Sequence, residues 1–346
     1  MKKLTHTKGR RHPESYPIKI KDPFLEDFTR ILHCKSYRRL ADKTQVISLP
    51  RNVYTRTRLT HTGEVLAIAT TISEHLNLNT SLCQAISAAH DIGHTPYGHL
   101  GEEMLTKILN KPFNHPIGSV VVAQHLEKDH GKGLNLTFET LQGILHHSRT
   151  NSIDLHTDPN LPNEYSAVMF ADKIAYTFSD LNDAMRYKFL NPQDLPDFIT
   201  SLGQNQDQRT YKVLQALIQE SKLKQRVEFK DSPIYQNFKK TRTFLYKKVY
   251  KAIDHSIKKV ILEKAYEFLS TEPKFKHATP EAAFLMLTDK QVDILGRAIN
   301  EKGKCTMQDI KGFGFSDSIA ILKNKNIDIT NPDLDWADER ESKEIK

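Results

Sequence analysis

The chain has 346 residues, of which 38% are hydrophobic and 27% charged, enough for the core of one large domain or two ordinary ones. No apolar run approaches about 18 residues, which excludes a transmembrane helix, and the basic start lacks the apolar stretch of a secretory signal. The three cysteines lack CxxC spacing, so we expect no disulfide framework and a cytoplasmic location. The net charge of +8 favours anionic partners, although a lysine-rich surface would give the same charge.

The dominant sequence period is helical, so we predict a mainly α protein with few short strands. The first helix is expected over 24–43. A second starts at Thr60, and apolar residues at positions 65, 68, 72 and 76 mark one of its faces. A third is expected over 81–91, where Gly93 suits the helix end. Further helices are predicted near 115–130, 137–149, 164–189, 208–225, 234–270, 279–288 and 290–301, and strand-like segments over 44–49 and 226–230.

Two of the predicted helices carry histidines on their apolar faces. His61 continues the apolar stripe of the second helix, and His90 follows Ile86 by four residues. Residues four apart share a helical face, so both histidines are expected to point inward. Asp91 follows His90 at the end of the helix, where a small rotation lets both side chains face one point.

A third feature is the polar stripe formed by Asp172, Tyr176 and Asp180 at a spacing of four residues. Each feature alone is weak, because buried histidines are usually core residues and polar stripes usually face solvent. Together they offer two imidazoles and two carboxylates, a set that fits Mn, Fe, Zn, Co or Ni, and Mg with more water. Such an ion can polarise a phosphoryl oxygen and activate water near neutral pH.

Longer motifs point to a known family: "RILHCKSYRRLADKTQV" (30–46), "TRLTHTGEV" (57–65), "HDIGHTPYGHLGE" (90–102), "GLNLTFETLQGILHHS" (133–148), "ADKIAYTFSDLND" (171–183) and "TRTFLYKKVY" (241–250). The pattern resembles the HD phosphohydrolase superfamily, and within it the deoxynucleoside triphosphate triphosphohydrolases, the dGTPase-like proteins. The resemblance covers about 23–255. It implies an HD-domain helical core there, preceded by a basic N-terminal segment over 1–22. A helical C-terminal region with a charged tail is expected over 256–346.

The resemblance implies metal-dependent hydrolysis of dNTPs to deoxynucleoside and inorganic triphosphate, which controls dNTP pools. The metal would be Mn, Mg, Fe, Co, Ni or Zn, and its implied ligands are His61, His90, Asp91 and Asp172. The implied catalytic residues are His94, His99, Glu102 and His115, with His99 as the acid at the 5′ oxygen. The implied substrate contacts are Gln45, Arg58, Lys173, Tyr176, Asp180, Arg242, Tyr246 and Tyr250.

Family members form homo-oligomers, often hexamers or tetramers, and can bind a regulatory dNTP or single-stranded DNA. The resemblance therefore implies these partners too, and no membrane partner is expected. One stretch, "FNHPIGS", departs from the bacterial pattern, in which Asn often follows the histidine. Pro116 suits the first turn of a helix that starts at His115, and it leaves open whether a second polar residue assists that histidine.

Two other functions fit the same sequence. Another HD phosphohydrolase, acting on nucleoside monophosphates or alarmone nucleotides, would share the metal ligands but release orthophosphate or pyrophosphate. A nucleic-acid-binding protein with a structural metal would explain the basic runs "FKKTR" and "YKKVYK". In that case DNA binding would depend steeply on salt and would survive loss of Asp91.

Overall fold

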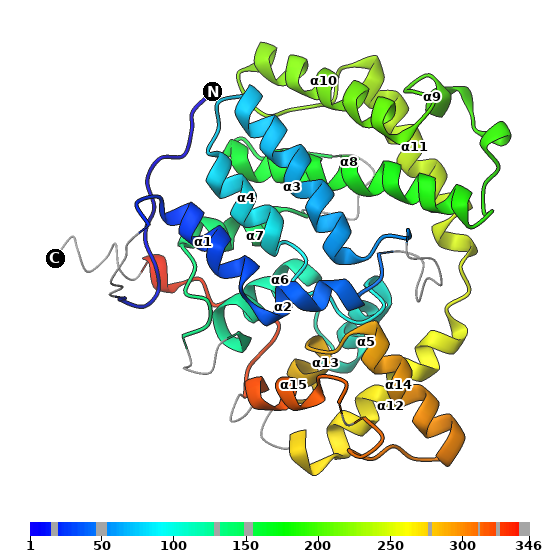
Figure 1. Ribbon diagram of the computed structural model, residues 1–346. Coiled ribbons are helices and arrows are strands. Elements are labelled where there is room, and N and C mark those ends of the chain that lie inside the picture. The colour runs from blue at the N-terminus through cyan, green and yellow to red at the C-terminus, as the bar shows by residue number, and fades with distance from the viewer. Residues whose placement is uncertain are drawn as a thin grey trace.

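The computed structural model is mainly α-helical, which confirms the predicted fold class (Figure 1). It describes residues 1–14, 20–45, 54–127, 132–148, 155–275, 279–310, 312–322 and 326–338. Across these residues β-structure is limited to two isolated bridges, Arg10–Thr137 and Thr44–Thr57.

The α-helices are α1 (Pro23–Leu32), α2 (Lys35–Arg39), α3 (Arg58–His75), α4 (Thr80–Ala89), α5 (His99–Leu109), α6 (His115–Val121), α7 (Phe138–His146), α8 (Asn163–Arg186), α9 (Asp197–Thr200), α10 (Gln206–Lys224), α11 (Pro233–Lys248), α12 (Ser256–Thr271), α13 (Pro280–Leu285), α14 (Asp289–Lys302) and α15 (Phe315–Leu322). Short 3₁₀ turns are η1 (Leu40–Asp42), η3 (Pro192–Asp194), η4 (Tyr250–Ala252) and η5 (Pro273–Phe275), and η2 (Val122–Leu126) is a π-helical turn.

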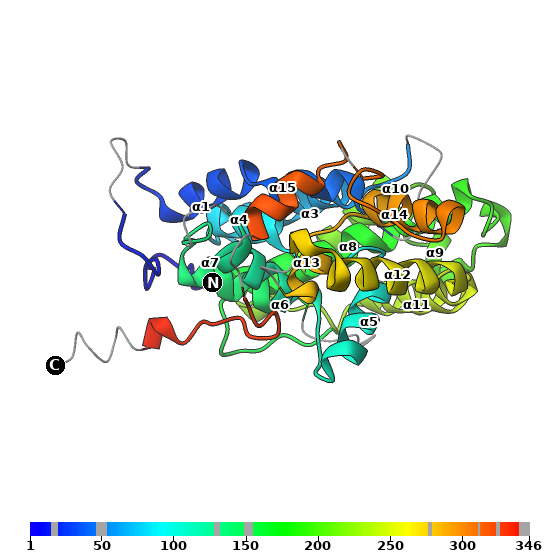
Figure 2. The same cartoon turned by 90° about the horizontal axis from the view of Figure 1, so that it is seen from below.

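Helices α3, α4 and α8 pack against one another and form the centre of the molecule. Helices α10 and α11 pack on α8, and α1 and α7 pack on α4 (Figure 1). The C-terminal helices α12 to α15 gather on the opposite side of the molecule, where α12 contacts α5. Seen from below, the chain forms a broad and rather flat body (Figure 2). The division at residue 255 stays a prediction.

The single helix predicted over 24–43 is wrong, because the chain breaks between α1 and α2. Cys34 is extended there (φ −80°, ψ 157°), and its sulfur accepts from the Tyr37 amide. The buried carboxylate of Glu127 also accepts from the amides of Lys35 and Ser36. Free amide groups at a helix start need acceptors, so a carboxylate about 90 residues away along the chain stabilises a new helix here.

The single helix predicted over 234–270 is also wrong. Helix α11 ends at Lys248, η4 follows, and α12 begins at Ser256. The break turns Tyr250 inward, where its hydroxyl donates to Asp180 at 2.6 Å. A tertiary contact thus replaces helical continuity that the local sequence would allow.

Three further predictions need correction. Helix α5 was not predicted, although Leu100, Met104 and Leu105 follow a helical period. The helix expected near 115–130 ends as an α-helix at Val121 and continues only as the π-helical turn η2. The strand expected over 226–230 is a loop, since its amides at Val227 and Lys230 donate to side chains rather than to a neighbouring strand. Of the segment 44–49, only the first two residues are described.

Candidate metal centre and adjoining histidine cluster

Three central helices supply the side chains that we call the metal group: His61, His90, Asp91 and Asp172. His61 lies in the first turn of α3, and His90 is the C-cap of α4, followed at once by Asp91. Asp172 lies on α8, which packs against both other helices. His61 and His90 are each 1% exposed, which agrees with the predicted inward orientation.

The metal group converges on a small volume. His61 Nε2 lies 3.1 Å from Asp172 Oδ1, and His90 Nε2 lies 3.9 Å from the same oxygen. One ligand atom from each of these three residues lies within 4.8 Å of the other two. His90 Nε2 is also 3.5 Å from Asp91 Oδ2, so a fourth donor faces the same point.

The donor atoms fit a divalent cation. His90 Nδ1 donates to the Ser87 carbonyl oxygen at 2.7 Å, which leaves a lone pair on Nε2 of the neutral ring. That Nε2 atom is buried and has no hydrogen-bond partner among the described residues. A buried polar atom without a partner is costly, and a cation would satisfy it. Burial also lowers the pKa of His90, which keeps the ring in the neutral form that binds metals.

The carboxylates of this group are ionised. Burial alone would raise the pKa of Asp91, but positive charge nearby, including that of Arg58, holds it well below its ordinary value. Burial would also raise the pKa of Asp172. Lys173 and His61 counteract this effect and hold the pKa of that carboxyl well below its ordinary value. Arg58 Nη1 donates to Asp91 Oδ2 at 2.7 Å, so the predicted phosphate-binding arginine is already an ion-pair partner of a metal-group residue.

Two glycines shape the turn between α4 and α5, which carries His94. A Cβ added at Gly93 would lie 2.0 Å from the carbonyl carbon of Gly118 on α6, so the two backbones meet where no side chain fits. Gly98 has a φ of +63°, a conformation that favours glycine. The turn therefore passes close to α6 and reverses quickly, which leaves the His94 and His99 rings 5.5 Å apart.

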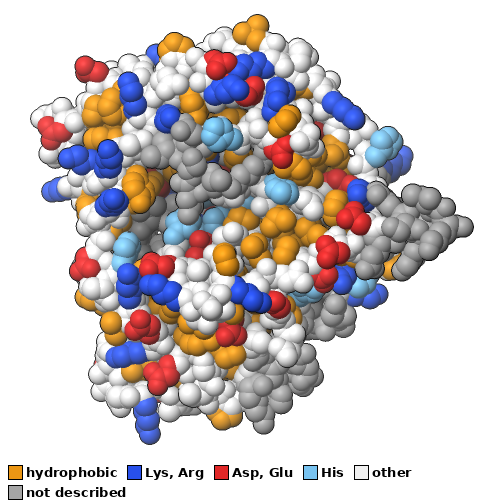
Figure 3. Space-filling view, turned by 180° about the vertical axis from the view of Figure 1, so that it is seen from behind, with side chains coloured by type: hydrophobic (Ala, Val, Ile, Leu, Met, Phe, Trp, Pro, Cys, Tyr) orange, Lys and Arg blue, Asp and Glu red, His pale blue; other side chains and the backbone are white. Residues whose placement is uncertain are grey.

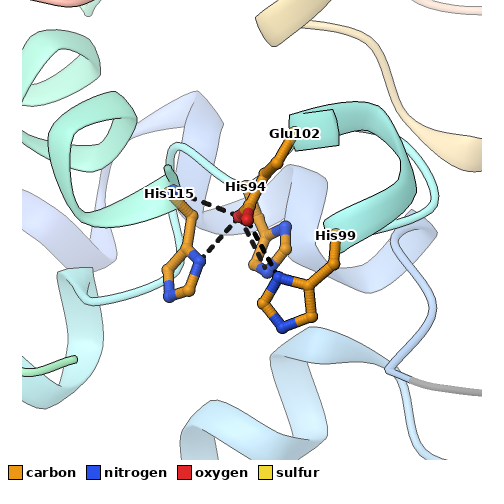
Figure 4. A group of neighbouring side chains, drawn as sticks. All are labelled: His94, His99, Glu102 and His115. Carbon is orange, nitrogen blue, oxygen red and sulfur yellow. Dashed lines mark hydrogen bonds and ion pairs between the residues drawn. The ribbon is translucent and has the colours of Figure 1, made fainter. Parts of the chain in front are cut away.

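Glu102, in the first turn of α5, lies among three histidines, and we call these four residues the histidine cluster (Figure 4). Its Oε2 accepts from His99 Nδ1 at 2.9 Å, and its Oε1 accepts from His115 Nδ1 at 2.7 Å. His94 stacks on His115 with ring centroids 4.3 Å apart, and its Nε2 is 3.7 Å from Glu102 Oε1. Helix α6 begins at His115, with Pro116 in its first turn as predicted, and Glu102 is the polar group that orients this histidine.

Electrostatics separate the protonation states of two neighbouring histidines. The negative charge of Glu102 raises the pKa of His99. Burial, and then the charge of Arg58, lowers the pKa of His94 well below its ordinary value. Burial would raise the pKa of Glu102, but His115 and His99 hold it well below its ordinary value. One histidine is therefore suited to donate a proton near neutral pH and the other to stay neutral.

The histidine cluster reaches solvent at His99, whereas its other three members are buried. The His99 side chain is 72% exposed, whereas Glu102 behind it is 11% exposed. On the face seen from behind, histidine and acidic side chains gather at a hollow in the middle of the surface (Figure 3). A molecule arriving from solvent can thus reach His99 first.

Several predicted substrate contacts lie along α8 beside the metal group. Lys173 Nζ donates to Asp172 Oδ2 at 2.9 Å and lies 5.4 Å from the ring centroid of Tyr176. Arg242, on α11, donates through Nε to the Tyr176 hydroxyl at 2.9 Å. Two cationic side chains thus meet at one aromatic ring next to the metal group.

The remaining predicted contacts divide into buried and exposed residues. Asp180 accepts from the Tyr250 hydroxyl, and burial raises the pKa of Asp180 to about 7. Gln45 Oε1 is buried and has no hydrogen-bond partner within the part of the chain that the structure describes. Tyr246 is 52% exposed and its ring lies 5.2 Å from Lys251 Nζ. The predicted helix 234–270 would place Tyr246 and Tyr250 one turn apart, but α11 ends between them.

Sequence reasoning missed His147, which lies beside both groups. It follows α7 as its C-cap, is fully buried, and its ring centroid is 5.1 Å from that of His90 and 5.2 Å from that of His115. Burial lowers its pKa to about 3. The pair of histidines at the end of the predicted helix 137–149 was the signal that could have found it.

Proteins similar to this chain share the region that contains the metal group and the histidine cluster. The HD domain model matches residues 58–177, which include the metal group and the histidine cluster. The chain is 38% identical over 336 residues to a deoxyguanosinetriphosphate triphosphohydrolase-like protein of Caldanaerobacter subterraneus subsp. tengcongensis, which covers 95% of this chain and 91% of the relative. The chain belongs to the deoxyguanosinetriphosphate triphosphohydrolase-like family. Relatives of the same description from Desulfatibacillum aliphaticivorans and Clostridium perfringens are 34% and 38% identical, over 80% and 75% of this chain and 81% and 77% of theirs.

Membership of the deoxyguanosinetriphosphate triphosphohydrolase-like family, together with the HD domain, makes this chain a metal-dependent phosphohydrolase. The histidines and carboxylates of the metal group could hold a divalent metal. Among the described residues, no helix has both the length and the apolar character that crossing a membrane requires.

Proposed function

We propose that this chain hydrolyses deoxynucleoside triphosphates to a deoxynucleoside and inorganic triphosphate. The observation that carries the proposal is an exposed histidine, His99, whose pKa Glu102 raises, in a cluster that adjoins the buried metal group where His115 Nε2 lies 3.8 Å from Asp91 Oδ1. Cleavage between the α-phosphorus and the 5′ oxygen expels a poorly stabilised alkoxide, so that reaction needs a positioned acid. Release of pyrophosphate would need such an acid much less.

The metal group would hold the cation through His61, His90, Asp91 and Asp172. A divalent ion bound there would polarise a phosphoryl oxygen and make water a better nucleophile. Lys173 and Arg242 lie where they can neutralise the charge of the phosphates, and both contact Tyr176. Arginine can hold a phosphate by two parallel hydrogen bonds, whereas lysine acts as a point charge.

The histidine cluster would move the proton. Water adds to the α-phosphorus, the bond to the 5′ oxygen breaks, and His99 Nε2 gives its proton to that oxygen. Glu102 accepts from His99 Nδ1, which orients the ring and stabilises its charge before transfer. His94, which stacks on His115, and the Glu102-bound His115 would contact the phosphates or take up the proton from water.

Recognition of deoxyribose is proposed for the α8 stripe. Asp180 would accept from the 3′ hydroxyl, and the ring of Tyr176 would pack where a 2′ hydroxyl would lie. A ribonucleotide then loses affinity through steric exclusion and through an unmet hydrogen bond. Gln45 Oε1 is an acceptor that a sugar hydroxyl could satisfy, while the exposed position of Tyr246 gives it the weakest support as a base contact.

The test is phosphorus NMR in water enriched in ¹⁸O, with Mn²⁺ or Mg²⁺ and each dNTP alone and in mixture. Attack at the α-phosphorus predicts inorganic triphosphate with one ¹⁸O and an unlabelled deoxynucleoside. GTP and ATP serve as ribonucleotide controls, and His90→Ala serves as the metal-site control.

Other outcomes would assign other functions. Orthophosphate or pyrophosphate would keep the metal group but favour action on monophosphates or alarmone nucleotides. If no mixture turns over, and salt-sensitive binding of single-stranded DNA survives Asp91→Asn, the nucleic-acid-binding alternative is favoured. The homo-oligomer, the regulatory dNTP, single-stranded DNA as a partner and the cytoplasmic location stay predictions, which light scattering and the mixed-dNTP rates would begin to test.

A further inference from the structure

Lys43 is a buried lysine outside the metal group and the histidine cluster. It follows η1 and is 1% exposed. Within the described part of the chain its amino group forms no ion pair, and its hydrogen bonds go to the backbone carbonyls of His94 and Leu285. Burial, and then the charge of Arg39, lowers the pKa of Lys43 well below its ordinary value. A buried amino group paired only with carbonyls is costly, so a lysine at this position calls for a functional explanation.

The ring of His94 is held differently from the other rings of the histidine cluster. Glu102 accepts a hydrogen bond from His99 and another from His115, and these bonds orient both rings. His94 Nδ1 is buried and has no hydrogen-bond partner among the described residues, and Nε2 lies 3.7 Å from Glu102 Oε1, which is too far for a hydrogen bond. Stacking on His115 sets the plane of the His94 ring but not its position within that plane. The position of the ring therefore depends on the backbone at residue 94.

Two hydrogen bonds hold that backbone. The His94 amide donates to the Asp91 carbonyl oxygen at 3.0 Å, and the His94 carbonyl oxygen accepts from Lys43 Nζ. The first bond ties the turn to a residue of the metal group, and the second ties it to the segment that precedes α3. Lys43 Nζ also lies 3.5 Å from the carbonyl oxygen of Leu285, the last residue of α13, so a third element limits its movement.

Lys43 also holds the start of α3, where Arg58 lies. The Lys43 carbonyl oxygen accepts from the Arg58 amide at 2.9 Å. The side chains of Arg58 and His94 both lie next to Gly98, because a Cβ added at Gly98 would be 2.9 Å from Arg58 Nη2 and 3.5 Å from His94 Cε1. Lys43 is thus hydrogen-bonded to the backbones of two residues whose side chains are neighbours and are both proposed to contact the phosphates.

We propose that Lys43 is a positioning residue, which places the His94 ring for hydrolysis by holding the His94 carbonyl oxygen. In this role Lys43 touches neither the substrate nor the metal and acts through His94. The proposal rests on the proposed function for the participation of His94 in hydrolysis. It does not depend on which bond of the phosphate ester is cleaved.

The test is a double-mutant cycle of Lys43→Met and His94→Gln. Methionine has a length similar to that of lysine but cannot donate a hydrogen bond. Hydrolysis of each dNTP and of bis(4-nitrophenyl) phosphate is measured with Mn²⁺. We expect His94→Gln to lower kcat/KM about 10²-fold or more, and Lys43→Met to lower it about 10-fold through the same parameter, kcat or KM.

The double variant distinguishes positioning from a general structural role. If Lys43 acts through His94, the double variant should match His94→Gln within about twofold, because the two effects are not independent. A separate structural effect of Lys43 would make the double variant about tenfold slower than His94→Gln, and that result would overturn the proposal. Lys107→Met is the control, since Lys107 is an exposed lysine on α5 that pairs with Glu103, and it should leave the rates unchanged.

A measurement without turnover separates this proposal from the proposed function. In protein labelled with ¹⁵N-histidine and loaded with Zn²⁺, the ring signals of His94 are assigned by their loss in His94→Gln. Lys43→Met should shift these signals and Lys107→Met should not. Unshifted His94 signals in Lys43→Met would overturn the positioning role even if no substrate is hydrolysed.

The two failures then have different signatures. Shifted His94 signals without dNTP hydrolysis would contradict only the proposed function, whereas dNTP hydrolysis with unshifted signals would contradict only the role of Lys43. Circular dichroism checks that Lys43→Met folds. If it does not, Lys43→Gln, whose shorter side chain carries no charge, takes its place in the cycle and in the labelled protein.

Discussion

The metal group and the histidine cluster adjoin each other but are built in different ways. The metal group lies inside three packed helices, and His61 and His90 are each 1% exposed. The cluster lies on a turn and at two helix starts, and the His99 side chain is 72% exposed. A cation site gains from a closed and rigid environment, whereas a proton donor must reach the leaving group.

The two groups also depend on different parts of the chain. The metal group is carried by α3, by α8 and by the end of α4, and Ser119 of α6 donates to the His90 carbonyl oxygen. The turn of the cluster is also braced by the C-terminal region. Asp289, at the start of α14, accepts from the amide of Tyr97 at 2.8 Å and from the amide of Thr44 at 3.0 Å. Buried Lys43 donates to the carbonyl oxygen of His94. We therefore expect changes in the two groups to separate metal binding from proton transfer.

The largest effect is expected from His90→Ala. It removes a metal ligand, so turnover should fall roughly 10³-fold or more and the protein should lose bound metal, since the ion contributes several kcal/mol to the transition state. His75→Ala, at the exposed end of α3, is the control and should keep both normal turnover and bound metal. Metal content and dNTP hydrolysis are measured on the same samples. Full activity of His90→Ala would show that the metal group is misplaced.

The next effect is expected from His99→Gln, which should lower kcat about 10²- to 10³-fold through loss of the general acid. Bound metal should be retained, because His99 is not one of the proposed ligands. Hydrolysis of bis(4-nitrophenyl) phosphate isolates the cause, since its leaving group needs no proton. An equal loss on both substrates would contradict the assignment of His99 as the acid.

The difference between the metal group and the histidine cluster also explains how much of each could be predicted from the sequence. His61 and His90 continue the apolar faces of their helices, so the apolar period predicts that both are buried. Asp172 lies on a polar stripe, so its burial does not follow from the period. The motif "HDIGHTPYGH" identified the cluster residues by resemblance, but it did not indicate that one carboxylate, Glu102, orients two of its histidines. That arrangement depends on how the turn and α6 meet, which is a tertiary feature.

The two helix breaks that the sequence did not predict share one physical cause. The breaks at Cys34 and Val249 follow from partners far along the chain, Glu127 in one case and Asp180 in the other. Local helical propensity continues through both positions, so sequence alone joins the helices. His147 was missed for a related reason: its neighbours come from other helices. Helix α5 is different, because its apolar period was present in the sequence and was overlooked.

A moderate effect is expected from Asp180→Asn, which tests the α8 stripe. Loss of a charged acceptor for the 3′ hydroxyl should lower kcat/KM for dNTPs about 10- to 100-fold. Because burial raises the pKa of Asp180 to about 7, the carboxylate forms as pH rises through that value. The KM of the unmodified protein should therefore fall as pH rises through about 7, and that dependence should vanish in Asp180→Asn. An unchanged KM profile would remove Asp180 from the substrate contacts.

A smaller effect, mainly on pH dependence, is expected from Glu102→Gln. An acid works while it is protonated, and Glu102 raises the pKa of His99 above its ordinary value of about 6.5. The alkaline limb of kcat/KM should therefore lie above that value in the unmodified protein and move to lower pH in Glu102→Gln. Glu103→Gln is the matched control, since Glu103 pairs with exposed Lys107. If the alkaline limb of kcat/KM lies at the same pH in Glu102→Gln, a group other than His99 determines that limb.

The smallest effect is expected from Asp289→Asn, which breaks the link between the C-terminal region and the cluster. Tyr97 has a φ of +55°, a strained conformation for this residue, and two acidic side chains of α14 hold it: Asp289 at its amide and Asp293 at its hydroxyl. An amide at position 289 can accept at one oxygen only, so either Tyr97 or Thr44 loses its acceptor. We expect the free energy of unfolding to fall by about 1–3 kcal/mol. Turnover should fall less than about tenfold, because His94 and His99 shift while the metal ligands stay in place.

Glu301→Gln, on the exposed end of the same helix, controls for the change of charge on α14. Bound metal should be the same in both variants, since among the described residues no hydrogen bond or ion pair joins Asp289 directly to the metal group. Thermal unfolding, kcat and metal content are measured for both variants and for the unmodified protein. If Asp289→Asn lowers metal content as much as it lowers turnover, the two groups are not independently supported. The contrast between a metal group held by the core and a cluster braced from the C-terminal region would then fail.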